Sequence, residues 1–209
     1  MRAKAPLIVV LGLGEAGLIH AHGLLAAGAR VGVASRRGTP PHFADKFYSD
    51  YDAPLQDSDV CGVVIATPYA THPALLRAAA QAGKHICVEK PVGASLAEAL
   101  TARDDARRVH TMVGFMRRHD AAYARAKARV DGGAYGRPLV LRALSGDAEY
   151  PAKYRRPGGA SPGAMWLDLA VHDIDAARWL LRDEVGAVHA HAGALVHGDL
   201  AALGEFLRS

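Results

Sequence analysis

The stretch that decides the fold is Leu7-Ile-Val-Val-Leu-Gly12-Leu-Gly14-Glu-Ala-Gly17. Its aliphatic run predicts a buried strand, and the helical spacing of residues 15–27 predicts a helix directly after it. Between the two, Gly12 permits a tight turn, Gly14 lets the backbone approach a pyrophosphate, and Gly17 lets helix and strand pack closely. The helix N-terminus offers free N–H groups to the phosphates. The alternative is a purely structural glycine-rich turn. The residues predicted to bind a dinucleotide are Gly12, Leu13, Gly14, Glu15, Ala16 and Gly17.

The chain up to residue 117 continues to alternate strand and helix signals. Ser95 can cap a helix over residues 96–109, and a second helix is expected over residues 72–82. Several Gly and Pro residues after Arg36 make the second crossover short. Repeated βαβ units predict an α/β fold, a doubly wound parallel sheet with helices on both faces. The further strands are expected at residues 30–34, 60–66, 85–88 and 111–115.

Beyond Arg117 the pattern changes. Residues 118–209 predict a second, incomplete α+β domain with an open sheet, whereas residues 1–117 form the dinucleotide-binding domain. Its expected elements are a helix at 121–130, a strand at 137–144, a loop at 149–163, a helix at 164–181, a strand at 185–196 and a helix at 200–207.

The segment Glu89-Lys90-Pro91 directly follows the predicted strand His85–Val88. In an open parallel sheet, the carboxyl ends of the strands are where ligands bind. Pro91 restricts Lys90 to extended geometry and so fixes the direction in which the lysine leaves the strand. An ammonium held in this way can take part in chemistry at that edge. The alternative is a solvated lysine in a strand-to-helix turn.

The end of the second strand bears on the choice of dinucleotide. An NAD enzyme usually places an acidic residue there to bond the ribose 2′-hydroxyl, but this chain has Ser35, Arg36 and Arg37. A hydroxyl and two guanidiniums suit a 2′-phosphate, because Arg binds phosphate through paired hydrogen bonds. We therefore predict NADP as cofactor, with NAD as the alternative if these arginines only form a solvated turn.

Composition narrows the classes of function. Half of the 209 residues are apolar, which fits a globular protein. The formal charge of +4 is dispersed and aromatic residues are only 6%, so nucleic-acid binding is disfavoured and small anions are favoured. No apolar stretch is long enough for a membrane span. Cys61 and Cys87 form no CxxC pair and are expected to be buried thiols in a reducing cytoplasm. His189, His191 and His197 predict no metal site, because no third suitably spaced ligand is evident.

A possible acid–base pair lies on the long helix of the second domain. Asp168, His172 and Asp175 stand at i, i+4 and i+7 and therefore share one helical face. A carboxylate one turn before a histidine can orient its ring and stabilise the imidazolium. The alternative is an ordinary helix ion pair.

The ordered set of motifs resembles the Gfo/Idh/MocA oxidoreductases, and residues 114–120 (Gly-Phe-Met-Arg-Arg-His-Asp) look most like their inositol dehydrogenase branch. The resemblance implies a Rossmann domain followed by an α/β domain with an open sheet, and a homo-oligomer formed through that sheet. It implies transfer of a hydride between a nicotinamide cofactor and a sugar or polyol. The motifs are Gly12-x-Gly14-x-x-Gly17, Ala66-Thr67-Pro68 with His72, Glu89-Lys90-Pro91 and Asp168-x-x-x-His172.

The resemblance also implies roles for single residues. Lys90 would bond the reacting hydroxyl, His172 would act as general base or acid, and Asp168 would bond substrate and orient one of them. The nicotinamide half of the cofactor would lie against Thr67, Pro68 and His72, and the cofactor would also contact Glu89 and Lys90. The substrate would contact Met116, Arg117 and Asp147.

Two departures from the family pattern leave alternatives open. Ser145-Gly146-Asp147 replaces the polar residues of the inositol branch, which puts polyol specificity in question. The chain ends at Ser209, where family members continue, so we expect a fragment, an association that covers the sheet, or a reduced second domain. Two further hypotheses are an NAD-dependent glycoside hydrolase that regenerates its cofactor, and a truncated nucleotide-binding protein without catalysis.

Overall fold

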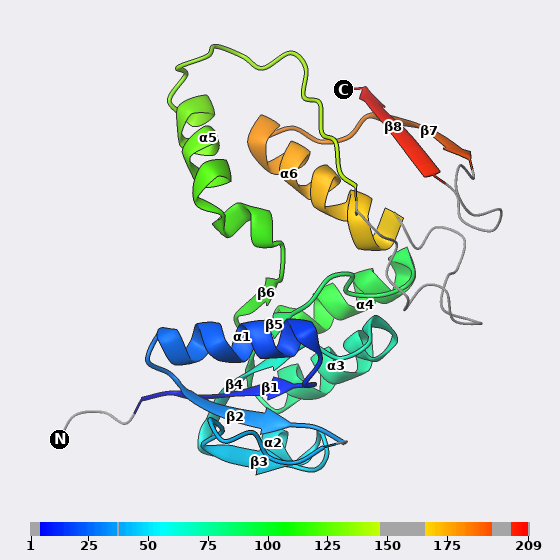
Figure 1. The fold of residues 1–209 in the computed structure, drawn as a ribbon. Coiled ribbons are helices and arrows are strands. Elements are labelled where there is room, and N and C mark those ends of the chain that lie inside the picture. Colours follow the sequence, from blue (N-terminus) through cyan, green and yellow to red (C-terminus); the bar gives the residue numbers. More distant parts are fainter. Residues whose placement is uncertain (1–4, 37, 147–165, 194–201, 209) are drawn as a thin grey trace. The chain divides into compact units, whose positions relative to one another are not determined.

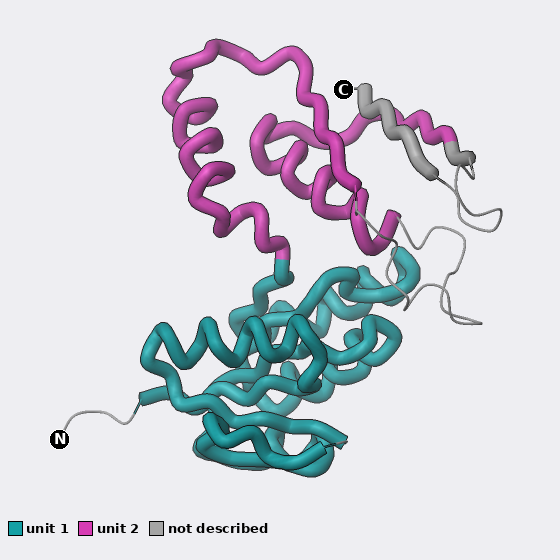
Figure 2. The backbone as a smooth tube through the Cα atoms, in the orientation of Figure 1, with its two compact units in different colours: residues 1–114 teal, residues 115–209 magenta. Residues whose placement is uncertain are grey.

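The computed structural model describes residues 5–36, 38–146, 166–193 and 202–208. The chain divides into two compact units, Met1–Gly114 and Phe115–Ser209 (Figure 2). The domain boundary between residues 117 and 118 that the sequence suggests falls within a short 3-10 turn, Met116–His119. It stays our proposal for where the cofactor domain ends.

The first unit is built on a six-stranded parallel sheet with the order β3-β2-β1-β4-β5-β6 (Figure 1). From β1 the chain runs outward through β2 to β3, and then returns to the other side of β1 for β4 to β6. The strand order therefore reverses between β1 and β4, which is the switch point of a doubly wound sheet. The strands are β1 Leu7–Leu11, β2 Arg30–Ala34, β3 Lys46–Tyr48, β4 Val60–Ile65, β5 His85–Val88 and β6 Thr111–Val113.

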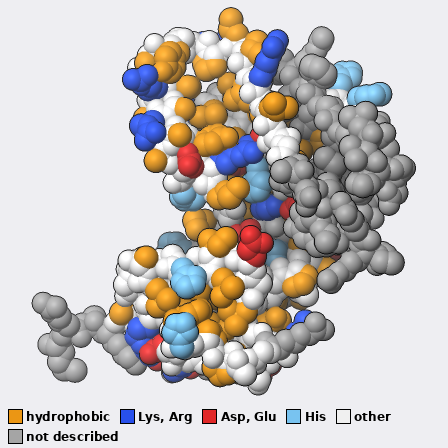
Figure 3. All heavy atoms as spheres, viewed as in Figure 1, with side chains coloured by type: hydrophobic (Ala, Val, Ile, Leu, Met, Phe, Trp, Pro, Cys, Tyr) orange, Lys and Arg blue, Asp and Glu red, His pale blue; other side chains and the backbone are white. Residues whose placement is uncertain are grey.

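Helices cover both faces of this sheet, and each face has its own buried cluster. Alternate residues of a strand point to opposite faces, so Val9 of β1 packs in the larger cluster with Leu76 of α3, whereas Val10 packs with Ala21 of α1. Figure 3 shows hydrophobic side chains gathered on the visible face of this unit, with histidines among them. The helices are α1 Glu15–Ala26, α2 Ala53–Gln56, α3 His72–Gln81 and α4 Leu96–Ala106.

The predicted α/β fold of this unit is confirmed, with three corrections. The helix α4 ends at Ala106 instead of 109. The edge strand β3 was not predicted; it forms because Lys46–Tyr48 pairs with the end of β2. The cysteines are not both buried: Cys61 is exposed and Cys87 is intermediate. The predicted cap is confirmed, since the Ser95 side chain accepts a hydrogen bond from the Glu98 N–H at 3.2 Å.

In its described residues, the second unit contains two α-helices and a separate two-stranded sheet. Asp120 caps α5 (Ala121–Asp131) by accepting from the N–H groups of Ala122 and Tyr123. A π-helical turn, Trp166–Ala170, leads into α6 (Val171–Leu181). The strands β7 (Ala187–Gly193) and β8 (Ala202–Arg208) pair antiparallel. Among the described residues, no helix has the length and apolar character needed to cross a membrane.

Two predictions for the second unit were wrong. Residues 200–207 were expected to be helical, but β8 forms there because it pairs along its whole length with β7. Residues 137–144 were expected to be a strand, yet they form no strand in the structure. Their side chains Leu139, Val140 and Leu144 are largely exposed, so the apolar pattern is present without a neighbouring strand to pair with in the described part of the chain. The predicted loop 149–163 lies outside the described residues.

Candidate functional site

The glycine loop has the geometry that a dinucleotide needs. Gly12 has φ +98°, and a Cβ placed on it would lie 2.7 Å from the carbonyl oxygen of Ala66. A Cβ on Gly17 would lie 2.1 Å from the carbonyl oxygen of Gly12, so the helix packs directly on the loop. Gly14 precedes α1 without a side-chain cap, and a Cβ there would meet nothing within 4 Å. The first turn of α1 is therefore open to a phosphate.

The loop after β4 forms the next part of this sheet edge. Thr67 is buried, and its hydroxyl lies 2.6 Å from that of Thr71, which donates to the carbonyl oxygen of Pro68. His72 was predicted to line the cofactor cleft, but it is completely buried. Its two ring nitrogens lie 2.9 Å and 2.8 Å from the carbonyl oxygens of Pro91 and Thr67. His72 thus joins two loops of the site from beneath.

The turn Glu89-Lys90-Pro91 lies beside that loop, at the carboxyl end of β5. The backbone N–H of Glu89 donates to the carbonyl oxygen of Ile65, which ties the turn to the end of β4. The carboxylate of Glu89 accepts a hydrogen bond from His20 of α1, at 2.7 Å. Lys90 is half-buried, and its peptide bond to Pro91 is cis. His20 was not predicted from the sequence, where its only signal is its place on the helix three residues after Gly17.

The structure describes Ser35 and Arg36 of the three residues that follow β2. Ser35 is half-buried, and its N–H donates to the carbonyl oxygen of Tyr48. Arg36 is exposed, and its guanidinium lies 5.3 Å from the centre of the Tyr51 ring. Arg37 lies outside the described residues. An exposed guanidinium that rests on an aromatic ring remains able to bind a phosphate through its outward edge.

In the second unit, Asp168 and His172 lie at the start of α6. Asp168 belongs to the π-helical turn and is half-buried, whereas His172 and Asp175 are buried in the α-helix that follows. The prediction of one regular α-helical face needs correction, because a π turn closes its hydrogen bonds over five residues instead of four. Asp175 is paired with Arg118 through two hydrogen bonds of 2.9 Å and 2.6 Å. A bidentate contact of this kind anchors α6 to the 3-10 turn.

The predicted substrate residues have different surroundings. Met116 is exposed, whereas Arg117 pairs with Asp173 and donates to the hydroxyl of Ser145 at 3.0 Å. That hydroxyl in turn donates to Asp173 at 2.7 Å. Asp147 lies outside the described residues. Neither Asp173 nor a contact of the Ser145 hydroxyl was predicted from the sequence, although Ser145 stands where the related branch has polar residues.

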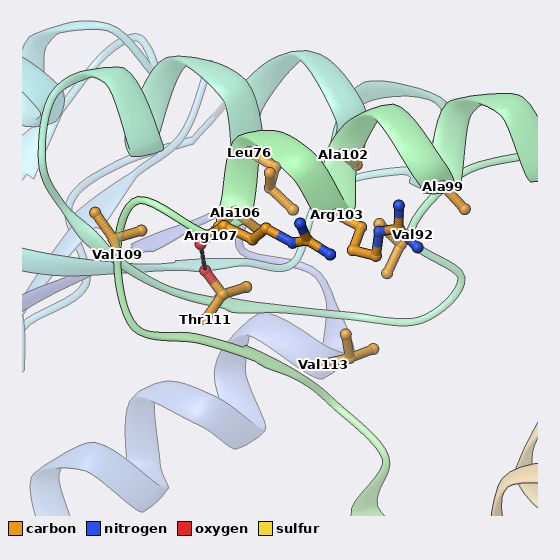
Figure 4. Close-up of a pocket in the computed structure, with 10 residues that line it drawn as sticks. All are labelled: Leu76, Val92, Ala99, Ala102, Arg103, Ala106, Arg107, Val109, Thr111 and Val113. Atoms are coloured by element: carbon orange, nitrogen blue, oxygen red, sulfur yellow. Dashed lines mark hydrogen bonds between the residues drawn. The ribbon is translucent and has the colours of Figure 1, made fainter.

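Among the described residues, two of the cavities each lie within a single unit. The larger, of about 350 Å³, lies against α4 and β6 and is mostly apolar, with Arg103 and Arg107 reaching across it (Figure 4). It does not include the glycine loop or the turn at Lys90, so we do not take it as the cofactor site. The smaller, of about 220 Å³, belongs to the second unit and is lined in part by Arg117, Asp173 and Tyr123.

The fold and the open helix N-terminus after Gly14 define a dinucleotide-binding α/β protein. A model of the oxidoreductase family with an NAD-binding Rossmann fold matches residues 7–116, and a GFO/IDH/MocA C-terminal domain model matches residues 123–205. The chain belongs to the Gfo/Idh/MocA family. The resemblance seen in the sequence is therefore confirmed.

Relatives of known function or structure are similar along most of this chain. The scyllo-inositol 2-dehydrogenase (NAD(+)) of Bacillus subtilis (strain 168) is 36% identical over 194 residues, 87% of this chain and 56% of that protein. A probable dehydrogenase from Thermotoga maritima has a TM-score of 0.83 at 32% identity, covering 91% of this chain and 59% of its own. The scyllo-inositol dehydrogenase from Lactobacillus casei, solved with NAD(H) and scyllo-inositol, has a TM-score of 0.76 at 28% identity, covering 92% and 61%. This chain spans less than two thirds of each.

The structure thus brings the predicted residues together in two groups. The first unit holds the glycine loop, Thr67, Pro68 and the turn at Lys90 along one sheet edge, on both sides of the switch point. The second unit holds Asp168 and His172 on one helix, with Arg117 paired to Asp173 on the same helix.

Proposed function

We propose that this chain carries the cofactor site and the acid–base groups of a dehydrogenase that transfers a hydride between a nicotinamide dinucleotide and a sugar or polyol hydroxyl. One observation carries the proposal. The open glycine loop after β1 and the turn at Lys90 after β5 lie at the same carboxyl edge, on opposite sides of β4. The relatives support the substrate class, since two of them are named for scyllo-inositol.

The residues of the first unit fit the dinucleotide. The space in front of Gly14 and the uncapped N–H groups of Glu15 and Ala16 suit the pyrophosphate. With the adenosine half toward β2, the nicotinamide half falls toward β4 and β5, where Thr67, Pro68 and Glu89 stand. When bound, the cofactor supplies the hydride acceptor or donor.

The protein groups then manage the charge and the proton. In the oxidation direction, the Lys90 ammonium donates a hydrogen bond to the substrate oxygen and stabilises the negative charge that develops on it. His172 accepts the hydroxyl proton and returns it in the reverse reaction. Asp168 bonds a substrate hydroxyl and orients the reacting groups. In the same proposal Met116 and Arg117 contact the substrate, as does Asp147, and His72 acts from behind the loop.

Turnover tests the proposal directly. Purified chain is mixed with scyllo-inositol or myo-inositol and each oxidised cofactor, and formation of reduced cofactor is followed by absorbance. We expect turnover that Lys90→Ala reduces at least about a hundredfold, while NADH binding, measured by fluorescence, persists. Binding without turnover on any polyol or sugar would reject the dehydrogenase. Cleavage of a glycoside without net change in cofactor absorbance would instead support the hydrolase.

The second specific proposal concerns the 2′ position of the adenosine ribose, which Ser35, Arg36 and Arg37 would contact. The exposed guanidinium of Arg36 supports NADP(H), whereas the names of two relatives support NAD(H). We expect Arg36→Asp to weaken NADPH binding about tenfold or more and to leave NADH binding nearly unchanged. Equal effects on both cofactors would remove Arg36 from the phosphate site. The ratio of the two affinities in the unaltered chain gives its natural cofactor.

The proposal also covers the cellular compartment of the protein and the association of its copies. Cys61 and Cys87 are both free thiols, which supports a reducing cytoplasm. Association of copies through the second unit would follow the pattern that the family resemblance implies. Sedimentation of the purified chain at several concentrations tests this, and a mass that stays monomeric would reject it.

A further inference from the structure

A histidine of the cofactor-binding helix holds the residue before Lys90. His20 of α1 donates to the Glu89 carboxylate at 2.7 Å. Both side chains are about three quarters shielded, with exposed fractions of 26% and 21%. The two residues are 69 positions apart in sequence, so this contact connects the helix after the glycine loop with the turn after β5.

The direction of the Glu89 side chain follows from strand alternation. Cys87 of β5 packs with the cluster on the α1 face of the sheet, and two residues later Glu89 points to the same face. Gly114, at the end of β6, leaves room for the carboxylate, since a Cβ on it would lie 2.9 Å from Glu89 Oε1. His20 therefore meets a carboxylate whose position is already limited by two strands.

The other flank of Lys90 is held from the opposite side. His72 begins α3, which packs in the cluster on the other sheet face, and its ring lies 2.9 Å from the carbonyl oxygen of Pro91. That ring is completely buried. Residues 89 and 91 are thus each in contact with a histidine, one from α1 and one from α3.

The electrostatics favour a fixed anion at Glu89. Burial alone would raise the pKa of its carboxyl, but the hydrogen bond and charge of His20, together with the backbone N–H and charge of Lys90, lower the pKa below its usual value. Glu89 consequently remains a hydrogen-bond acceptor at neutral pH. A carboxylate that lost its His20 contact would be partly buried with one fewer donor, and would turn toward solvent or toward Lys90.

We propose that His20 is a positioning residue: by holding Glu89, it fixes the turn that presents Lys90 and the nicotinamide-facing backbone. This inference rests on the proposed function only for the identity of the cofactor and the role of Lys90. The dinucleotide itself is expected to strengthen the coupling, because its pyrophosphate binds at the N-terminus of the same helix that carries His20.

Paired binding measurements test the proposal without any turnover. NADH and ADP-ribose share the pyrophosphate and the adenosine, but only NADH carries the nicotinamide. In titrations of the full chain, we expect His20→Leu to weaken NADH about fivefold to tenfold and to change ADP-ribose less than twofold. Equal weakening of both ligands, or no change in either, would overturn the proposal.

Three further variants separate positioning from general damage. His20→Gln keeps an N–H donor at similar reach and should restore NADH binding, whereas Glu89→Ala, which removes the acceptor, should reproduce the loss if His20→Leu does not fold. His22→Leu is the matched control, because His22 lies on the same helix but is exposed and contacts Phe43. It should leave both ligands unaffected. A loss with His22→Leu equal to that with His20→Leu would refute the specific contact.

Turnover adds a second readout and keeps the two proposals distinct. With an active polyol, His20→Leu should lower kcat about tenfold while the KM for the polyol stays within about twofold. A chain that never turns over but shows the NADH-specific loss would reject the dehydrogenase and retain the role of His20. Normal kcat in His20→Leu would reject the positioning of Lys90.

Discussion

Gly14 stands just before α1 and Gly17 three residues later within it, yet a methyl group has opposite consequences at the two positions. A Cβ on Gly17 would approach the Gly12 carbonyl oxygen to 2.1 Å, whereas one on Gly14 would meet nothing within 4 Å. We expect Gly17→Ala to lower the free energy of unfolding by about 1–3 kcal/mol, because helix and loop must separate. Urea denaturation followed by circular dichroism measures this loss.

Gly14→Ala is the matched variant, and its effect should appear in binding instead. Its backbone is extended, with φ −74°, so alanine fits and the unfolding free energy should change by less than about 1 kcal/mol. The added methyl occupies the space proposed for the pyrophosphate, so NADH should bind at least about tenfold more weakly. Unchanged NADH affinity would place the phosphates elsewhere.

The two cysteines should differ in reactivity. Burial, aided by the nearby Glu89 carboxylate, raises the pKa of the Cys87 thiol to about 11, whereas Cys61 is exposed. Since the thiolate is the reacting species, Cys87 presents roughly a hundredfold fewer thiolates near pH 8 than a free cysteine. Mass spectrometry after brief iodoacetamide treatment should find label on Cys61, and Cys61→Ser should abolish the fast reaction. Rapid labelling of Cys87 in the folded chain would contradict the raised pKa.

At the scale of elements, a charged cluster joins the edge strand β3 to the segment just before β4. Asp57, just before β4, accepts from Lys46 at 2.7 Å and from the Tyr48 hydroxyl at 2.8 Å, both on β3. The Lys46 hydrogen bond, the Asp59 N–H and the Tyr48 hydroxyl hold the pKa of Asp57 well below its usual range. The contact therefore stabilises the edge strand whenever the carboxylate is ionised.

This cluster predicts a particular pH dependence. A depressed pKa in the folded state contributes stability above the unfolded pKa of about 3.9, and the contribution disappears as pH falls toward the folded value. Asp57→Asn should therefore unfold at lower urea than the unaltered chain at pH 7, and the difference should shrink below about pH 4. Asp104→Asn, on an exposed surface pair, should show little difference at any pH. A gap for Asp57→Asn that stays constant from pH 7 to 3 would contradict the assignment.

Which elements the sequence predicts depends on where their partners lie. β1, β2 and β5 are found as predicted, because each is a short run in which apolar residues predominate and are largely buried. The strand β3 was not predicted, because Lys46–Tyr48 contains no apolar run and forms a strand only through its pairing with β2. β8 was mistaken for a helix because a short apolar segment fits both periods, and its pairing with β7 decides the outcome.

The candidate site shows the same division. The glycine loop and the turn at Lys90 follow local rules for strand ends, so both were predictable. His72 was given a direct role, although its complete burial beneath two carbonyl oxygens makes it a support. The contact of His20 with Glu89 joins positions 69 residues apart, and nothing in the spacing of a single sequence indicates it.

For the whole molecule, the division into two compact units predicts which residues cofactor binding stabilises. The residues proposed to hold the dinucleotide belong to Met1–Gly114. A ligand that binds only the native state at a hundred times its Kd adds about 2.7 kcal/mol of stability. Hydrogen exchange with NADH should therefore slow in β1, α1 and β5, and remain unchanged in β7. Equal slowing in both units would show that they respond as one cooperative body.

The lengths of the outermost strands have a consequence for how this protein behaves when concentrated. Both edges of the main sheet, β3 and β6, are only three residues long. A longer, flat border would offer a row of unmet backbone donors and acceptors on which a foreign strand could grow. Here so brief a border gives an incoming segment few places to attach. We therefore expect the short edge strands to protect the parallel sheet from growing into fibres. The longer central strands, which position the nucleotide site, need not be shortened for this protection.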